Sequence, residues 1–124
     1  MNLRIAMAIA LGGAFGAVAR FYISGLLPVY GGDFPVGTLM VNSIASLILG
    51  YLYGLLFWGF DVPPDWRAFF GTGFCGALST FSTFSYETFS LLREREYLIA
   101  TLNILANVII TIALVFAGFM LARR

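Results

Sequence analysis

Residues 76–87 read GALSTFSTFSYE and bring five serine or threonine residues, two phenylalanines and one carboxylate into a chain that is otherwise mostly aliphatic. Three glycines, Gly71, Gly73 and Gly76, lead into these hydroxyls. A membrane helix that breaks needs backbone freedom and side chains that hydrogen-bond the released backbone groups, which glycine and serine or threonine supply. The stretch therefore predicts a membrane helix that breaks at Ser79 and Thr80.

The composition places this stretch in a membrane protein. The chain has 124 residues, 60% of them hydrophobic and 10% charged, with a mean hydropathy of +0.93, whereas a soluble domain carries about 25% charged residues. A spanning helix needs about 20 apolar residues. Four runs are long enough, which predicts a single transmembrane domain over residues 1–124 with spans of about 5–27, 36–60, 69–92 and 98–122. We expect an all-α membrane protein of four transmembrane helices, the third broken near its middle.

The start of the chain has a second interpretation. Arg4, a short apolar run and the segment Ala17-Val18-Ala19 are also typical of a secretory signal with a small-residue cleavage site. The apolar run continues to Leu27, so that it is long enough to span a bilayer. This length favours a helix of the mature protein.

Several classes of chemistry are excluded by the residues that the sequence lacks. There is no histidine, and the one cysteine, Cys75, is expected to be a small packing residue. These absences exclude metal sites built from histidine and cysteine, haem ligation and histidine-based triads. The sequence also has no glycine-rich nucleotide-binding unit. We expect no enzyme activity and no nucleic-acid partner.

The arginines are almost evenly divided between the two sides of the membrane. The chain has no lysine; Arg93 and Arg95 lie on one side with Arg20 near them, and the other side holds Arg4, Arg67, Arg123 and Arg124. Orientation in the membrane follows an excess of positive charge on one side, and this excess is small. The balance predicts insertion in both orientations and an antiparallel, dual-topology homodimer. A single orientation with a weak bias stays open.

Small and polar residues recur at helical spacing in three of the spans. Two stripes hold glycines, one of Gly12 and Gly16 and the other of Asn42, Ser46, Gly50 and Gly54. Such stripes pack helices either within one subunit or across a dimer, and both alternatives stay open. The Asn42 amide must face protein or water, because lipid cannot satisfy it.

The fourth span repeats this pattern with three polar side chains on one helix face, Asn103, Asn107 and Thr111. A polar ladder of this kind either joins helices or lines a path. Because a hydrogen bond between membrane helices contributes only about 0.6 kcal/mol, we favour a path.

The half-helix after the break offers groups that suit a small anion. Phe81 and Phe84 share a face with Ser85, while Ser82 and Thr83 point elsewhere. Aromatic edges carry partial positive charge, so rings beside hydroxyl and amide donors stabilise an anion without a full cation. The break also offers carbonyl oxygens to a hard cation such as Na⁺ and a positive helix end to an anion.

The apolar runs contain two charged residues, Arg20 and Glu87. A cation pathway would usually contain buried carboxylates, so this inventory favours an anion. Arg20 can raise the local anion concentration at a vestibule, and Glu87 can cap, gate or pair with a cation. The alternative for both is a side chain that reaches the membrane interface.

Three motifs together resemble the CrcB or Fluc family of fluoride channels. They are GGAFGAVARFY at residues 12–22, GTLMVNSIAS at 37–46 and TGFCGALSTFSTFSYE at 72–87, and the resemblance extends over essentially the whole chain. It implies dual-topology antiparallel dimers that conduct fluoride passively through two pores in the bacterial plasma or inner membrane, confer fluoride resistance and hold a central structural Na⁺.

The resemblance also implies roles for particular residues. The Na⁺ ligands would be the backbone carbonyls of Gly76 and Ser79 from both subunits. Arg20 would lie toward a vestibule, and the fluoride pore would be lined by Asn42, Phe81, Ser82, Thr83, Phe84, Glu87 and Thr111. Family members tend to have a tyrosine or a hydroxyl residue where this chain has Asn103 and Asn107, so these two positions depart from the pattern.

Two other classes of function remain. A proton-coupled multidrug exporter can also have four short spans, but it needs a carboxylate deep in the first helix, where this chain has Arg20. An accessory subunit of a larger complex would explain the size and the glycines, but not the clustered hydroxyls.

Overall fold

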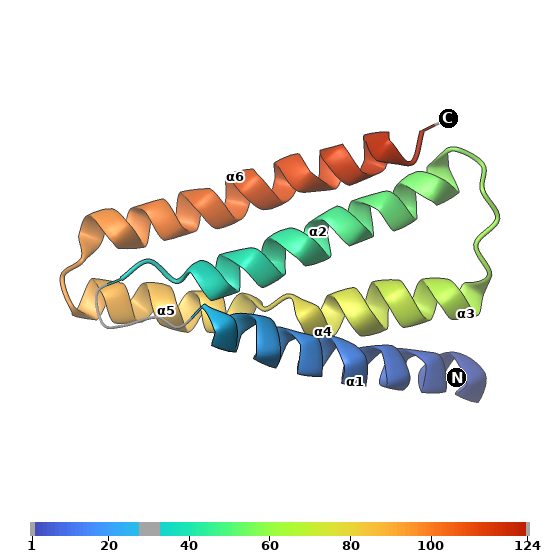
Figure 1. Ribbon diagram of the computed structural model, residues 1–124, viewed down its shortest axis with the longest axis horizontal. Coiled ribbons are helices and arrows are strands. Elements are labelled where there is room, and N and C mark those ends of the chain that lie inside the picture. The colour runs from blue at the N-terminus through green and yellow to red at the C-terminus, as the bar shows by residue number, and fades with distance from the viewer. Residues whose placement is uncertain (1, 28–32, 124) are drawn as a thin grey trace.

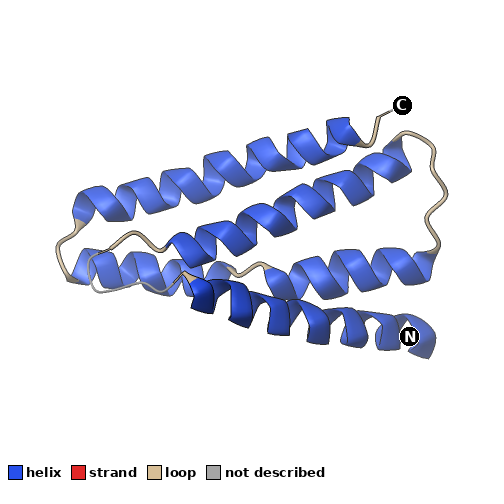
Figure 2. Cartoon of the chain, viewed as in Figure 1, coloured by secondary structure: helices blue, strands red, loops and turns tan. Residues whose placement is uncertain are grey.

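The computed structural model describes residues 2–27 and 33–123, and this part of the chain is helical throughout apart from short connections (Figures 1 and 2). The elements are α1 (Leu3–Leu26), α2 (Val36–Phe57), α3 (Pro64–Arg67), the π-helix η1 (Ala68–Cys75), α4 (Gly76–Leu78), α5 (Phe81–Arg93) and α6 (Tyr97–Leu121). By length and composition α1, α2 and α6 can each cross a membrane. The chain is thus an all-helical, multi-pass membrane protein.

The predicted third span corresponds to four helical segments in line. Figure 1 shows α3, η1, α4 and α5 following one another beside α1 and α2, with a short non-helical step between α4 and α5. The helix begins at Pro64 and not at Phe69 as expected, because proline fits the first turn of a helix, where its missing N–H is not needed. The predicted break near the middle of this span is confirmed.

The helices pack in two main pairs around a small core. α2 packs against α6, and α1 packs against η1 and α4. Between these pairs lies a buried cluster of Val41, Ala45, Cys75 and Leu78. Cys75 is therefore a buried packing residue, as expected.

Glycines allow both helix pairs to approach closely. A Cβ atom on Gly50 would meet the backbone of Val115 on α6, and one on Gly12 would meet the Phe69 carbonyl on η1. Gly54 likewise faces α6. Of the two alternatives left open by the glycine stripes, packing within one subunit is therefore the one found at these positions.

Replacing Gly50 with valine is expected to destabilise the chain by about 3 kcal/mol or more, because the new side chain would push α2 away from the α6 backbone. Thermal unfolding in detergent, followed by circular dichroism, measures the effect. Gly25→Ala is the matched control, because nothing lies within 4 Å of a Cβ atom there. Equal melting of both variants would contradict the close packing of α2 on α6.

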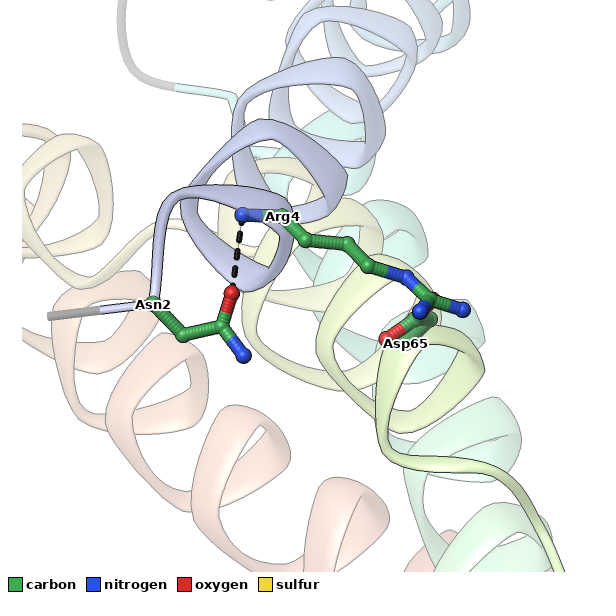
Figure 3. Close-up of polar contacts among 3 residues, drawn as sticks. All are labelled: Asn2, Arg4 and Asp65. Carbon is green, nitrogen blue, oxygen red and sulfur yellow. Dashed lines mark hydrogen bonds and ion pairs between the residues drawn. The ribbon is translucent and has the colours of Figure 1, made fainter.

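An ion pair joins the start of α1 to α3. The Arg4 Nε atom lies 2.5 Å from Asp65 Oδ2, and the side chain of Asn2 accepts a hydrogen bond of 3.0 Å from the Arg4 backbone N–H (Figure 3). Arg4 is largely exposed, so the pair contributes little to stability, on the order of 1 kcal/mol or less. The pair therefore links the start of α1 to α3 without adding much to the stability of the chain.

Candidate functional site

The break lies at Ser79 and Thr80, both of which have extended backbones (φ/ψ of −81°/159° and −150°/119°). The Ser79 hydroxyl donates to the Cys75 carbonyl at 3.0 Å. Thr80 Oγ1 accepts from the Thr83 N–H at 3.2 Å and so caps the start of α5. Hydroxyls thus bond to the backbone groups beside the break, as predicted.

Asn42 on α2 forms hydrogen bonds with both the backbone N–H and the backbone carbonyl of Thr80. Its Oδ1 atom accepts from the Thr80 N–H at 2.7 Å, and its Nδ2 atom donates to the Thr80 carbonyl at 3.3 Å. Nδ2 also donates to Asn107 Oδ1 on α6 at 3.0 Å. The prediction that the amide of Asn42 faces protein or water is confirmed.

The polar ladder of α6 continues these hydrogen bonds toward α5. Asn107 Nδ2 donates to both Oδ1 and the carbonyl oxygen of Asn103 at 2.9 Å, and Asn103 Nδ2 donates to Thr88 Oγ1 at 3.0 Å. Thr88 in turn donates to the Phe84 carbonyl at 2.8 Å. Thr111 donates to the carbonyl of Asn107. The ladder therefore ties α2, α5 and α6 together.

A cavity of about 340 Å³, here called the Asn42 cavity, opens beside the break. It brings four of the predicted pore residues together, Asn42, Phe81, Phe84 and Thr111. The rings of Phe81 and Phe84 lie 5.6 Å apart, centre to centre, at 52°. The other lining residues are Ser46, Ser79, Thr80, Asn107, Val108 and Ile112. None of the described residues that line this cavity carries a charged side chain.

Only part of the polar ladder of α6, which we expected to line a path, lies at a cavity. Asn107 and Thr111 line the Asn42 cavity, but Asn103 is fully buried and lines none of the cavities described here. The expectation of a path was therefore wrong for Asn103, because its amide is enclosed between α6 and Thr88 of α5.

The charged residues of the spans lie in a second cavity of about 530 Å³, the Arg20 cavity. Arg20, Thr83 and Glu87 line it, together with Ala17, Phe21, Ser24, Gly25, Leu27, Gly37, Thr38 and Thr80. The Arg20 Nε atom donates at 2.9 Å to the carbonyl of Ala77, just before the break. Glu87 Oε1 is buried and has no hydrogen-bond partner among the described residues.

The remaining predicted residues lie elsewhere. Ser82 is exposed and lines neither of these cavities. Gly76 and Ser79 line a third, smaller cavity of about 140 Å³. Gly76 has an ordinary helical conformation (φ −61°, ψ −34°), so the expectation that its position requires unusual backbone freedom was wrong.

Sequence reasoning assigned no pore role to Thr80, although this residue lines both of the larger cavities. A threonine directly before a half-helix is typical of an N-cap, and that position was the available signal. The sequence analysis also gave no role to Thr38, which is buried at the Arg20 cavity. Thr38 is the third residue of α2 and belongs to no pattern that marked it.

These features define a small, multi-pass helical membrane protein with uncharged polar groups gathered at the break between α4 and α5. A model of the family described as "CrcB-like protein, Camphor Resistance (CrcB)" matches residues 7–119, and the chain belongs to this family.

Relatives that match over nearly their full length carry the name of an ion channel. "Fluoride-specific ion channel FluC" of Thermococcus kodakarensis is 98% identical over 124 residues, which is 100% of both chains. The protein of the same name from Thermococcus onnurineus is 84% identical over 100% of both chains. That of Methanocaldococcus jannaschii is 51% identical over 97% of this chain and 95% of its own. The family is thus one of channels and not of enzymes.

Proposed function

We propose that this chain is a passive, fluoride-selective ion channel. The observation that carries the proposal is the lining of the Asn42 cavity, which combines amides, hydroxyls and two aromatic rings without a charged side chain. Such a lining stabilises an anion weakly enough for it to leave again. The relatives named as fluoride-specific channels support fluoride as the ion.

Selectivity arises from the replacement of water around the ion. Fluoride is small and strongly hydrated, so it enters only where donors and aromatic edges take over from its hydration shell. Arg20, in the neighbouring cavity, raises the local anion concentration. A membrane potential that is negative inside the cell then drives the anion outward through the plasma membrane, which confers fluoride resistance.

Two copies in opposite orientations form the working channel, with one pore for each copy. Phe81 is 79% exposed on the single chain, so a partner is needed to enclose its side of the pore. The near balance of arginines supports both orientations; Arg124 in that tally lies outside the described residues.

A reporter that is active on only one side of the membrane, fused to the C-terminus, should reveal both orientations within one population. Two arginines added to the loop at residues 28–35, most of which lies outside the described residues, should bias insertion strongly. Transport should then fall until a copy with the opposite bias is supplied. A reporter found wholly on one side would contradict the homodimer.

A structural Na⁺ at the dimer centre fits the groups at the break. In an unbroken helix the Thr80 N–H would bond to the Gly76 carbonyl, but here it bonds to Asn42 Oδ1. The released carbonyl of Gly76 and that of Ser79 are hard oxygen ligands of the kind such a cation prefers. Bound there, Na⁺ would hold the two breaks together by its charge.

Replacing Na⁺ with a bulky organic cation should weaken fluoride transport or dimer integrity at least tenfold, without any Na⁺ being transported. Fluoride efflux and size-exclusion chromatography in rigorously Na⁺-free buffer measure these effects. Adding Na⁺ back should restore both fluoride efflux and the dimer. Full activity without Na⁺ would show that the channel does not need this ion.

Reconstitution into liposomes separates the channel from the other classes of function. Ion flux without a second substrate supports a channel, and drug-for-proton exchange would indicate an exporter. The absence of any measurable transport would indicate an accessory subunit. In the structure the one charged side chain within α1 beyond its first turn is Arg20, so α1 lacks the carboxylate that an exporter needs.

A further inference from the structure

The two larger cavities have a single lining residue in common. Thr80 lines both the Asn42 cavity and the Arg20 cavity, and no other residue of either lining does so. An anion that passed directly from one cavity to the other at this shared residue would pass beside Thr80. The side chains that follow it divide, because Phe81 and Phe84 turn to the Asn42 cavity and Thr83 and Glu87 to the Arg20 cavity.

Almost every side-chain donor in the Asn42 cavity already has an acceptor. Both donor hydrogens of Asn42 are used, by the Thr80 carbonyl and by Asn107, and those of Asn107 are directed to Asn103. The hydroxyls of Ser46, Ser79 and Thr111 each donate to a backbone carbonyl, of Asn42, Cys75 and Asn107 respectively. These groups would have to break a bond before they could bind an anion.

The hydroxyl of Thr80 is different. Its oxygen accepts from the Thr83 N–H, but among the described residues its own hydrogen has no acceptor. Among the described residues it is the one side-chain hydroxyl or amide donor in the lining of the Asn42 cavity that no hydrogen bond already uses. The N-cap bond uses one lone pair and leaves the hydrogen to point away from the helix end.

We propose that Thr80 donates the hydrogen bond to the anion at the junction of the two cavities, and that Asn42 is a positioning residue that holds Thr80 there. Asn42 binds the N–H and the carbonyl of Thr80 and so fixes the extended backbone from which the hydroxyl projects. Asn107 holds the amide of Asn42 in turn. The ligand is a small, strongly hydrogen-bonding anion; its identity as fluoride rests on the proposed function.

Substitutions at Thr80 separate the hydroxyl from the fold. Thr80→Val should lower fluoride efflux from liposomes at least tenfold, and Thr80→Ser, which keeps the donor and the cap, should remain within about threefold of the parent. Thr80→Gly removes the hydroxyl at a position where glycine is an acceptable cap, so it serves if valine prevents folding. The matched control is Thr101→Val, whose exposed hydroxyl only donates to the Tyr97 carbonyl.

A double-mutant cycle then tests how Asn42 acts. If Asn42 works through Thr80, Asn42→Ser and Thr80→Val combined should be no worse than the more damaging of the two alone. If both side chains contact the anion, their effects should multiply to 100-fold or more. The multiplied result, or parent-like efflux in Thr80→Val and Thr80→Gly, would overturn this inference. A parent chain that passes no fluoride would instead overturn the proposed function.

Discussion

Asn42→Asp is expected to lower fluoride efflux by about 100-fold or more. The carboxylate keeps the shape of the amide but puts oxygen where Nδ2 now donates to the Thr80 carbonyl at 3.3 Å and to Asn107 Oδ1 at 3.0 Å. Oxygen would then face oxygen at both contacts, so residue 42 could no longer hold the Thr80 carbonyl and Asn107 in place. The charge would also repel the anion along a path of low dielectric constant.

The measurement is fluoride efflux from liposomes that hold equal amounts of folded dimer. Ser46→Ala is the control, because Ser46 lines the same cavity but only donates to the backbone of its own helix, and its loss should have a much smaller effect. Parent-like efflux in Asn42→Asp would show that the amide has no part in conduction.

The second large effect is expected for Phe81→Ile and Phe84→Ile, each of which should lower transport about tenfold or more. Isoleucine keeps apolar bulk but removes the aromatic edge and its partial positive charge. Phe81 is mostly exposed on the single chain, so its replacement should leave the fold of each subunit nearly unchanged. Fluoride efflux is measured against the melting temperature of the same preparation.

Phe116→Ile is a matched control, because Phe116 is an exposed aromatic residue of α6 outside the Asn42 cavity. We expect Phe81→Ile and Phe84→Ile to lower fluoride efflux and Phe116→Ile to leave it unchanged. Equal efflux from Phe81→Ile, Phe84→Ile and Phe116→Ile would show that Phe81 and Phe84 are packing residues.

The break could be predicted from the sequence because its chemistry is local. Ser79 and Thr80 are hydroxyl residues after a run of glycines, and in the structure both have extended backbones and bond to backbone groups close by in the chain. The role of the glycines, in contrast, depends on contacts with residues far away in the sequence. Gly73 has its Cβ direction blocked by the backbone of α1, so it serves close packing, which only the folded arrangement can reveal.

The division of the site into two cavities also depended on tertiary structure. Helical spacing placed Phe81 and Phe84 on one face and Thr83 on another, and the structure agrees. Spacing could not show that Asn103 would be enclosed by Thr88 while Asn107, one turn later, would reach the cavity. That difference follows from where α5 crosses α6.

Arg20 shows the same limit. Its charge within an apolar run suggested either a vestibule or the membrane interface, and the structure adds a bond from its Nε atom to the Ala77 carbonyl at 2.9 Å. The carbonyls at the end of a half-helix carry partial negative charge, so this bond also stabilises the break. No sequence pattern links two residues so far apart in the chain.

The purified chain alone should conduct fluoride selectively and passively. Liposomes that contain the protein, loaded with equal fluoride and chloride, are diluted into a medium free of both, and each ion is followed with its own electrode. We expect rapid release of fluoride once a potassium ionophore lets K⁺ leave with it and so prevents a membrane potential from building up. Chloride should stay inside until detergent is added. Release of both ions at one rate, or fluoride release no faster than from protein-free liposomes, would contradict this expectation.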